Sequence, residues 1–115
     1  MERTHKTWGD RVRVHRNDLS EVSYLDLMPN QRCSWHTHQT KFNQFFVVEG
    51  TIYIKTDWGL SEVTEGQVFT TRPGEWHEFQ TGDIAAKVIE VMYVQYDEAD
   101  IQRKDLGGPV KAKDL

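Results

Sequence analysis

The feature that most constrains this chain is a succession of short β-forming segments separated by turn residues. Segments rich in Val, Ile, Thr, Tyr and Phe occupy residues 11–15 (RVRVH), 22–28 (VSYLDLM), 42–48, 51–56 (TIYIKT), 67–71, 76–80 and 85–96. Turn pairs such as Pro29-Asn30 and Pro73-Gly74 punctuate them. This spacing predicts an all-β sandwich or barrel. It further predicts a hairpin joining 42–48 to 51–56, and a central strand within 85–96 that is covered on both faces.

The length of 115 residues, of which 37% are hydrophobic, suits one folded domain. We expect an N-terminal extension at 1–10, a barrel at 11–106 and a flexible C-terminal tail at 107–115. Within residues 97–105 the acidic side chains precede the basic ones, as a helix dipole favours. The sequence therefore predicts one short helical turn there.

Charge and composition narrow the expected partners. The net charge is −4 and no basic stripe is present, so nucleic acid is not an expected partner. The apolar runs are shorter than the roughly 20 residues of a membrane span. The N-terminal stretch has no apolar core typical of a secretory signal. The single cysteine, Cys33, cannot form an internal disulfide, which indicates a reducing, cytoplasmic location.

Three of the five histidines could meet at one point. His36 and His38 form an H-x-H pair, and on a β-strand residues i and i+2 face the same side. His77 follows a Pro-Gly turn, where a returning strand could bring it opposite the pair. Neutral imidazoles are good ligands for zinc, iron, nickel, copper or manganese. The alternative is that the H-x-H pair lies on an exposed strand face without a metal.

The residues flanking these histidines resemble two known motifs. HTHQTKFNQFFVVEG resembles the first cupin motif, and GQVFTTRPGEWHEFQ resembles the second. The resemblance implies a single-domain cupin, a double-stranded β-helix or jelly-roll barrel. It also implies one divalent metal ion (zinc, iron, manganese or nickel) bound by His36, His38 and His77.

One position departs from the first motif. Asn43 stands where cupins carry a glutamate ligand, and a neutral amide oxygen is a weaker ligand than a carboxylate. The sequence thus predicts a three-imidazole site without a carboxylate. Asn43 is either a further candidate ligand or a hydrogen-bond partner of a metal-bound water. Phe45 and Val47 share the strand face of Asn43, so we expect them to line the substrate pocket, with Phe79 in a similar role.

The C-terminal part of the chain carries a second resemblance. VVEGTIYI and IEVMYVQYDEADIQRKDLGG look like the cupin domain of type II phosphomannose isomerases. That resemblance implies that Arg103 contacts the phosphate of a sugar phosphate. The alternative is that Arg103 is a solvated charge on a terminal turn.

Three functions follow from these features. The first is a metal-dependent enzyme on a small organic molecule, of the sugar-phosphate isomerase or epimerase kind. The second is a three-histidine iron dioxygenase, and the third is a non-catalytic small-ligand, sugar-binding or sensor cupin. Exposed sheet edges and an apolar outer sheet face predict a homodimer.

Overall fold

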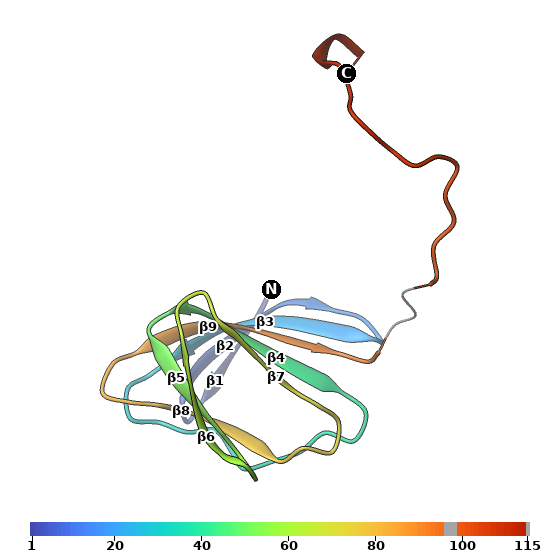
Figure 1. Ribbon diagram of the computed structural model, residues 1–115. Helices are drawn as coiled ribbons and strands as arrows, with labels where there is room; N and C mark the ends of the chain where they lie inside the picture. Colours follow the sequence, from blue (N-terminus) through green and yellow to red (C-terminus); the bar gives the residue numbers. More distant parts are fainter. Residues whose placement is uncertain (96–98, 115) are drawn as a thin grey trace.

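Two antiparallel β-sheets face each other in the computed structural model, which describes residues 1–95 and 99–114 (Figure 1). This arrangement confirms the predicted all-β jelly roll. The strands of the described residues are β1 Glu2–Lys6, β2 Gly9–Arg16, β3 Ser20–Leu27, β4 Phe42–Glu49, β5 Thr51–Thr56, β6 Gly59–Thr64, β7 Val68–Thr71, β8 His77–Thr81 and β9 Ala86–Tyr93. A short 3-10 turn, η1, spans Ala112–Asp114.

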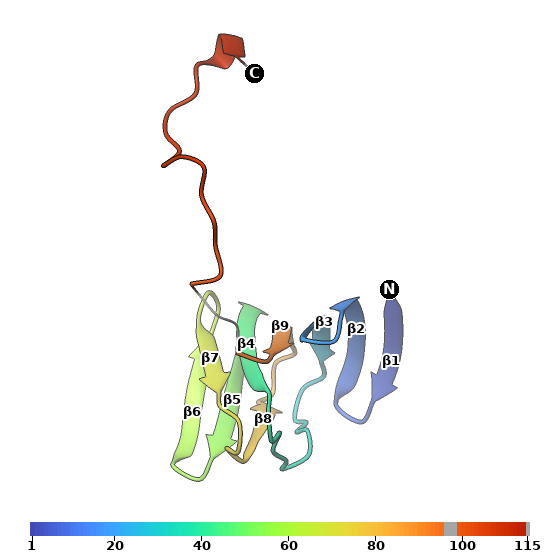
Figure 2. The ribbon, with the colours of Figure 1, turned by 90° about the vertical axis from the view of Figure 1, so that its right-hand side faces the viewer.

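The larger sheet has the strand order β1-β2-β3-β9-β4-β7, and the smaller sheet has the order β6-β5-β8 (Figure 2). Alternate residues of each strand face the space between the sheets. Leu25, Phe45 and Val88 enter it from the larger sheet, and Ile52 and Ile54 enter it from the smaller one. All five are at most 1% exposed, so this layer supplies most of the apolar burial that stabilises the barrel.

The predicted hairpin between residues 42–48 and 51–56 is wrong. β4 pairs with β7 and β9, whereas β5 pairs with β6 and β8. The chain crosses from one sheet to the other at Gly50, which has a φ of 83°. A Cβ at Gly50 would lie 2.8 Å from the carbonyl oxygen of Ala85, so glycine permits both the backbone conformation and the close approach.

The first ten residues contain β1, which the sequence did not predict. β1 pairs with β2 from Glu2↔Arg13 to Lys6↔Gly9, and the Arg13 guanidinium donates to both Glu2 carboxylate oxygens at 2.8 Å. The strand is polar and mostly exposed, so pairing with β2 explains it better than burial does. The predicted limits of the N-terminal extension, barrel and tail stay a prediction.

The C-terminal segment differs from the expected short helix. Tyr96, Asp97 and Glu98 lie outside the described residues, and no helix is present in the described remainder, 99–105. Side chains from Ala99 to Lys113 are exposed, and Figure 1 shows the segment leading away from the sheets. A helix this short needs tertiary packing to form. Across residues 1–95 and 99–114, no helix has the length and hydropathy to cross a membrane.

Candidate metal site

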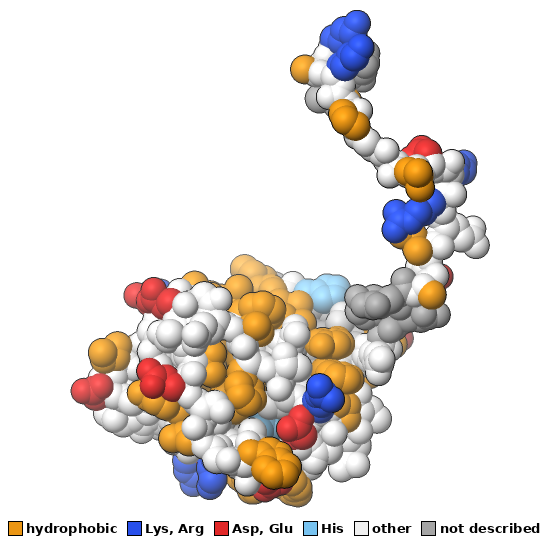
Figure 3. Space-filling model, viewed as in Figure 1, with side chains coloured by type: hydrophobic (Ala, Val, Ile, Leu, Met, Phe, Trp, Pro, Cys, Tyr) orange, Lys and Arg blue, Asp and Glu red, His pale blue; other side chains and the backbone are white. Residues whose placement is uncertain are grey.

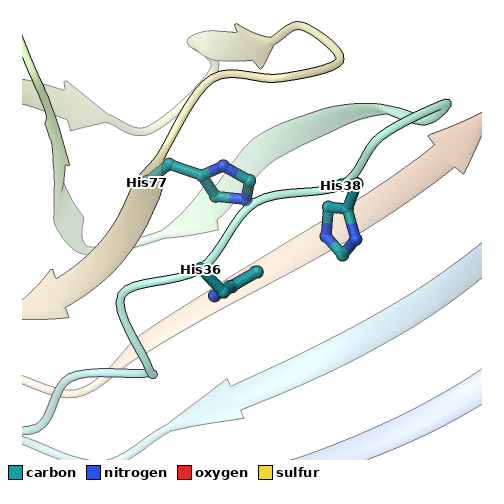
Figure 4. A group of neighbouring side chains, drawn as sticks. All are labelled: His36, His38 and His77. Carbon is teal, nitrogen blue, oxygen red and sulfur yellow. The ribbon is translucent and has the colours of Figure 1, made fainter.

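Three histidines from two parts of the chain lie together (Figure 4). His36 and His38 lie between β3 and β4, and His77 begins β8. Backbone hydrogen bonds in both directions join His36 to His77, at 3.1 and 2.8 Å. One potential ligand nitrogen from each ring lies within 4.8 Å of the other two. The structure therefore brings the three predicted ligands together.

The expectation that H-x-H lies on a strand is wrong. Residues 28–41 form an irregular connection that pairs with β8 at the isolated bridges Arg32↔Gln80 and His36↔His77 and is joined to it between them by single hydrogen bonds, such as that from the Cys33 N–H to the Phe79 carbonyl oxygen at 3.1 Å. The connection passes from the larger sheet to the edge of the smaller one, and regular pairing is not maintained along it. The bridge at His36 still aligns this histidine with His77.

In two of the imidazoles Nδ1 is hydrogen-bonded to a backbone carbonyl, which leaves Nε2 available as a metal ligand. His77 Nδ1 donates to the Glu75 carbonyl oxygen at 3.0 Å, and His36 Nδ1 donates to the Ser34 carbonyl oxygen at 2.6 Å. Nε2 then carries the lone pair in each neutral ring. His77 is 1% exposed, and its Nε2 is buried without a hydrogen-bond partner. A buried, unpartnered imidazole nitrogen beside two further imidazoles fits a metal ion, with the backbone carbonyls fixing the tautomers.

The electrostatics of the cluster favour neutral rings. Burial lowers the pKa of His77; the hydrogen bond to the Glu75 carbonyl opposes this shift, and the neighbouring His36 adds a smaller lowering. Burial also lowers the pKa of His38, with smaller contributions from His36, His77 and Lys41. Neutral imidazole is the metal-binding form, so both side chains are available as ligands at neutral pH.

Asn43 lies inside the barrel close to a carboxyl group. Its side chain is 1% exposed, and its Nδ2 donates to Glu90 Oε2 at 3.3 Å. Its Oδ1 is buried without a partner. An amide oxygen therefore stands where the cupin motif has a carboxylate ligand. Metal binding by Asn43 stays a prediction.

The predicted pocket residues lie in different places. The Phe45 ring centroid is 6.3 Å from that of His77 and 6.0 Å from that of Phe79. Val47 and Phe79 belong to the buried core. Arg103 is exposed in the C-terminal segment, and the structure does not bring it to the histidines. Substrate binding by these four residues stays a prediction.

Sequence reasoning missed polar residues on the inner face of the larger sheet. Glu90 sits in the middle of an apolar run, on the same face as Val88 and Met92, and burial raises its pKa. Ser23 pairs directly with Glu90, and Arg11 pairs with Leu25 on the same face. The detectable signal was a charged residue at a core-facing position of an otherwise apolar strand.

Comparison with known protein families matches residues 23–92 to the cupin domain. The chain belongs to the cupin family. The match spans most of the barrel and includes all three histidines of the cluster. Among curated proteins, no sequence matches the chain. The predicted relationship to type II phosphomannose isomerases is not confirmed.

Solved cupin-like structures share this fold at low sequence identity. KdgF from Halomonas sp. superposes with a TM-score of 0.74 at 13% identity, covering 85% of this cupin and 90% of that chain. The Cnp3 cupin domain of Schizosaccharomyces pombe gives 0.72 at 8%, covering 80% and 69%. An uncharacterized conserved protein with a double-stranded β-helix domain from Klebsiella pneumoniae gives 0.71 at 18%, covering 81% and 78%. At such identities the likeness establishes the fold alone.

Proposed function

We propose that this cupin binds one divalent metal ion through His36, His38 and His77 and is a metal-dependent enzyme acting on a small organic molecule. The buried, unpartnered Nε2 of His77 carries the proposal. Leaving such an acceptor without a partner costs about 1–3 kcal/mol, and two neighbouring imidazoles make a metal ion the partner that fits best. Zinc, iron, manganese and nickel are the candidate ions.

The surrounding residues suit carbonyl or hydroxyl chemistry. His36, His38 and His77 would hold the metal ion, which would supply Lewis-acid polarisation of a substrate oxygen. Asn43 presents an unpartnered amide oxygen that accepts a hydrogen bond from substrate or water. Glu90, whose pKa is raised by burial, is the nearby carboxyl able to hold or pass a proton. Isomerisation or epimerisation of a hydroxylated substrate is the reaction class we propose.

A phosphate on that substrate has weaker support than the metal. The sugar-phosphate assignment depended on Arg103, which is exposed beyond the last strand. We therefore propose the reaction class without the phosphate group.

A three-histidine iron dioxygenase is the second candidate. It is favoured by the absence of a carboxylate from the ligand cluster among the described residues. Asn43, at the motif position of the fourth ligand, is also neutral, so it adds no negative charge to the three imidazoles. Oxygen consumption by the iron-loaded protein would distinguish this reaction from an isomerisation.

Elemental analysis of protein purified from metal-replete medium tests the proposal. We expect one equivalent of a first-row metal per chain, lost in His36→Ala and retained in His5→Ala, since His5 is exposed on β1. Turnover of hydroxylated aldehydes or ketones supports the isomerase. Stoichiometric metal without turnover of either substrate class favours a non-catalytic binding or sensor cupin. Absence of metal in the purified protein and of uptake by the apoprotein contradicts the proposal.

We also propose a homodimer formed through the outer face of the larger sheet. Hydrophobic side chains are present on the barrel surface seen in Figure 3. On the outer face of the larger sheet, Phe46, Val48 and Val68 are 39%, 47% and 48% exposed. Apolar sheet faces of this kind are typical association surfaces. Analytical ultracentrifugation should show a dimer that Phe46→Lys converts to monomer, and a monomeric wild type would contradict it.

The cytoplasm remains the proposed location. Cys33 is buried, and burial raises the pKa of its thiol to about 12. The thiol therefore stays protonated and unreactive. Cell fractionation tests this location, and recovery in an extracellular or periplasmic fraction would contradict it.

A further inference from the structure

The turn that precedes β8 contacts two of the three clustered histidines. It spans residues 72–75 and is called the site turn below. The Glu75 N–H donates to the Arg72 carbonyl oxygen at 3.1 Å and closes the turn. Pro73 and Gly74 stand at its two central positions, and Gly74 has a φ of 83°. A proline followed by a glycine of positive φ is typical of a type II β-turn, so the sequence itself favours this backbone.

Two backbone groups of the site turn bind the histidines. The Gly74 N–H donates to the His38 carbonyl oxygen at 2.8 Å. The Glu75 carbonyl oxygen accepts from His77 Nδ1 at 3.0 Å. The His77 ring lies 4.5 Å from the His36 ring and 5.6 Å from the His38 ring, between centroids (Figure 4). A displacement of the site turn would therefore move the His38 backbone and release the His77 ring together.

The carboxylate of Glu75 completes the site turn. Its Oε1 accepts from the Arg72 N–H at 2.8 Å. The first and last residues of the turn are thus joined twice, once by the backbone and once by this side chain. A carboxylate that accepts from a backbone N–H forms a charge-assisted hydrogen bond, which is stronger than a neutral one. The side chain of Glu75 therefore holds the turn whose backbone holds the histidines.

The chain contains a second turn of the same construction at residues 64–67, called the reference turn below. The Gln67 N–H donates to the Thr64 carbonyl oxygen at 3.0 Å, and Gln67 Oε1 accepts from the Thr64 N–H at 3.0 Å. Gly66 has a φ of 80°, and its N–H donates to the Val47 carbonyl oxygen at 2.9 Å. The reference turn makes the same three bonds with a glutamine in place of the glutamate, so an amide oxygen suffices for the side-chain bond.

The two turns lie at opposite ends of β5. Thr64 of the reference turn pairs with Thr51 at the start of β5. His77, which follows the site turn, pairs with Thr56 at the end of β5. The reference turn therefore stabilises the fold away from the histidines. A comparison of the two turns separates a role in the site from ordinary turn stability.

We propose that Glu75 is a positioning residue of the histidine cluster. Its carboxylate holds the site turn, which fixes the tautomer of His77 and the place of the His38 backbone. The proposal deepens the proposed function and rests on it only for the effect on metal affinity, because the His77 tautomer is measurable in metal-free protein. A side chain that acts by accepting a hydrogen bond can be replaced by an amide, whereas one that acts by its charge or as a base cannot.

Nitrogen NMR of the metal-free protein at pH 8 measures the His77 tautomer. In wild type, Nε2 should give the resonance of an unprotonated nitrogen. Glu75→Ala should shift this resonance toward that of a protonated nitrogen, because a loosened turn admits the other tautomer. Glu75→Gln and the control Gln67→Ala should match wild type. An unshifted resonance in Glu75→Ala, or an equal shift in Glu75→Gln, would overturn the proposal.

Titration with Co²⁺ gives a second readout. Glu75→Ala should weaken Co²⁺ binding about threefold to tenfold, the equivalent of one hydrogen bond, and Glu75→Gln should bind like wild type. The control Gln67→Ala loses the matching bond of the reference turn. It should lower the melting temperature about as much as Glu75→Ala does and leave the affinity unchanged. Equal losses of affinity in Glu75→Ala and Gln67→Ala would show a general effect on stability and contradict the positioning role.

A pair of glycine variants tests the turn without changing the carboxylate. Gly74→Ala and Gly66→Ala each place a Cβ in open space at nearly the same positive φ, so the backbone strain should be similar. Only Gly74→Ala should weaken Co²⁺ binding and shift the His77 resonance. These two variants decide the matter if Glu75→Ala does not fold, and equal effects in both would contradict the role of the site turn.

The two proposals can fail separately. Absence of saturable Co²⁺ binding in wild type contradicts the metal proposal, and the His77 resonances still decide the role of Glu75. Metal binding by wild type together with an unshifted resonance in Glu75→Ala overturns the positioning role alone.

Discussion

The two ends of the barrel interior are built differently from the same strands. On β3, Leu25 and Leu27 lie in a fully packed apolar layer, whereas Ser23, on the same face and equally buried, has no hydrogen-bond partner. On β9, Val88 belongs to the apolar layer and Glu90 to the polar end. Strand alternation is therefore uninterrupted, and only the side-chain chemistry changes along each strand.

This difference separates what stabilises the fold from what serves the site. Burial of large apolar side chains stabilises the packed end at about 25 cal/mol per Å². At the other end, unpartnered polar atoms and the half-buried carboxyl group of Glu90 reduce stability. Native proteins accept such local costs at binding and catalytic sites, so replacing polar-end residues should affect stability far less than replacing core residues, or even raise it.

The largest expected difference in stability is between two variants of β3, Leu25→Ala and Ser23→Ala. Leu25→Ala should lower the free energy of unfolding by about 3 kcal/mol, because it leaves a cavity in a side-chain position 1% exposed. Ser23→Ala, two residues away on the same face, should change it by less than about 1 kcal/mol, since no hydrogen bond is lost. Urea denaturation of both variants measures the difference. Similar losses in the two variants would contradict the division of the interior.

Glu90→Gln should stabilise the metal-free protein on the order of 1 kcal/mol at pH 7. Burial raises the pKa of Glu90, so the folded state binds its proton more tightly than the unfolded state does. The penalty of ionising this group is absent at acid pH and grows as pH rises through the raised pKa. The stabilisation by Gln should therefore be larger at pH 8 than at pH 5 in denaturation curves. A destabilising effect at pH 8 would show that the charged carboxylate has a stabilising partner.

The smallest expected effect is the pH dependence that the histidine cluster gives to the free energy of unfolding. Burial lowers the pKa of His38 and His77 below that in the unfolded chain. The unfolded state therefore binds more protons as pH falls from about 6.5. The free energy of unfolding of the apoprotein should decrease over that window, by about 1 kcal/mol or less. His77→Gln should reduce this slope, and His15→Gln, at an exposed position, should leave it unchanged. Equal slopes in all three proteins would contradict the assignment.

The sequence was sufficient for the features set by local pattern. Turn pairs and alternation predicted most strands, and the spacing of His36, His38 and His77 predicted their convergence. Features set by long-range pairing were not predictable in the same way. Gly50 marks a turn, but only the structure shows that the chain changes sheets there.

The polar end shows the same limit. Glu90 is conspicuous within an apolar run, yet its pairing with Ser23 and its contact with Asn43 depend on strands far apart in sequence. The unpaired state of Arg11 likewise depends on Glu2 and Glu21 contacting Arg13 instead. Such partner assignments require the register of four strands, which a single sequence does not specify.

The central claim is that three imidazoles hold one divalent ion, and titration of the apoprotein with Co²⁺ tests it most directly. Visible absorption should rise to saturation at one equivalent per chain in wild type and in His15→Ala. His77→Ala should remove most of that absorption and weaken binding about a hundredfold or more. No saturable absorption in wild type, or an unchanged titration in His77→Ala, would contradict the account.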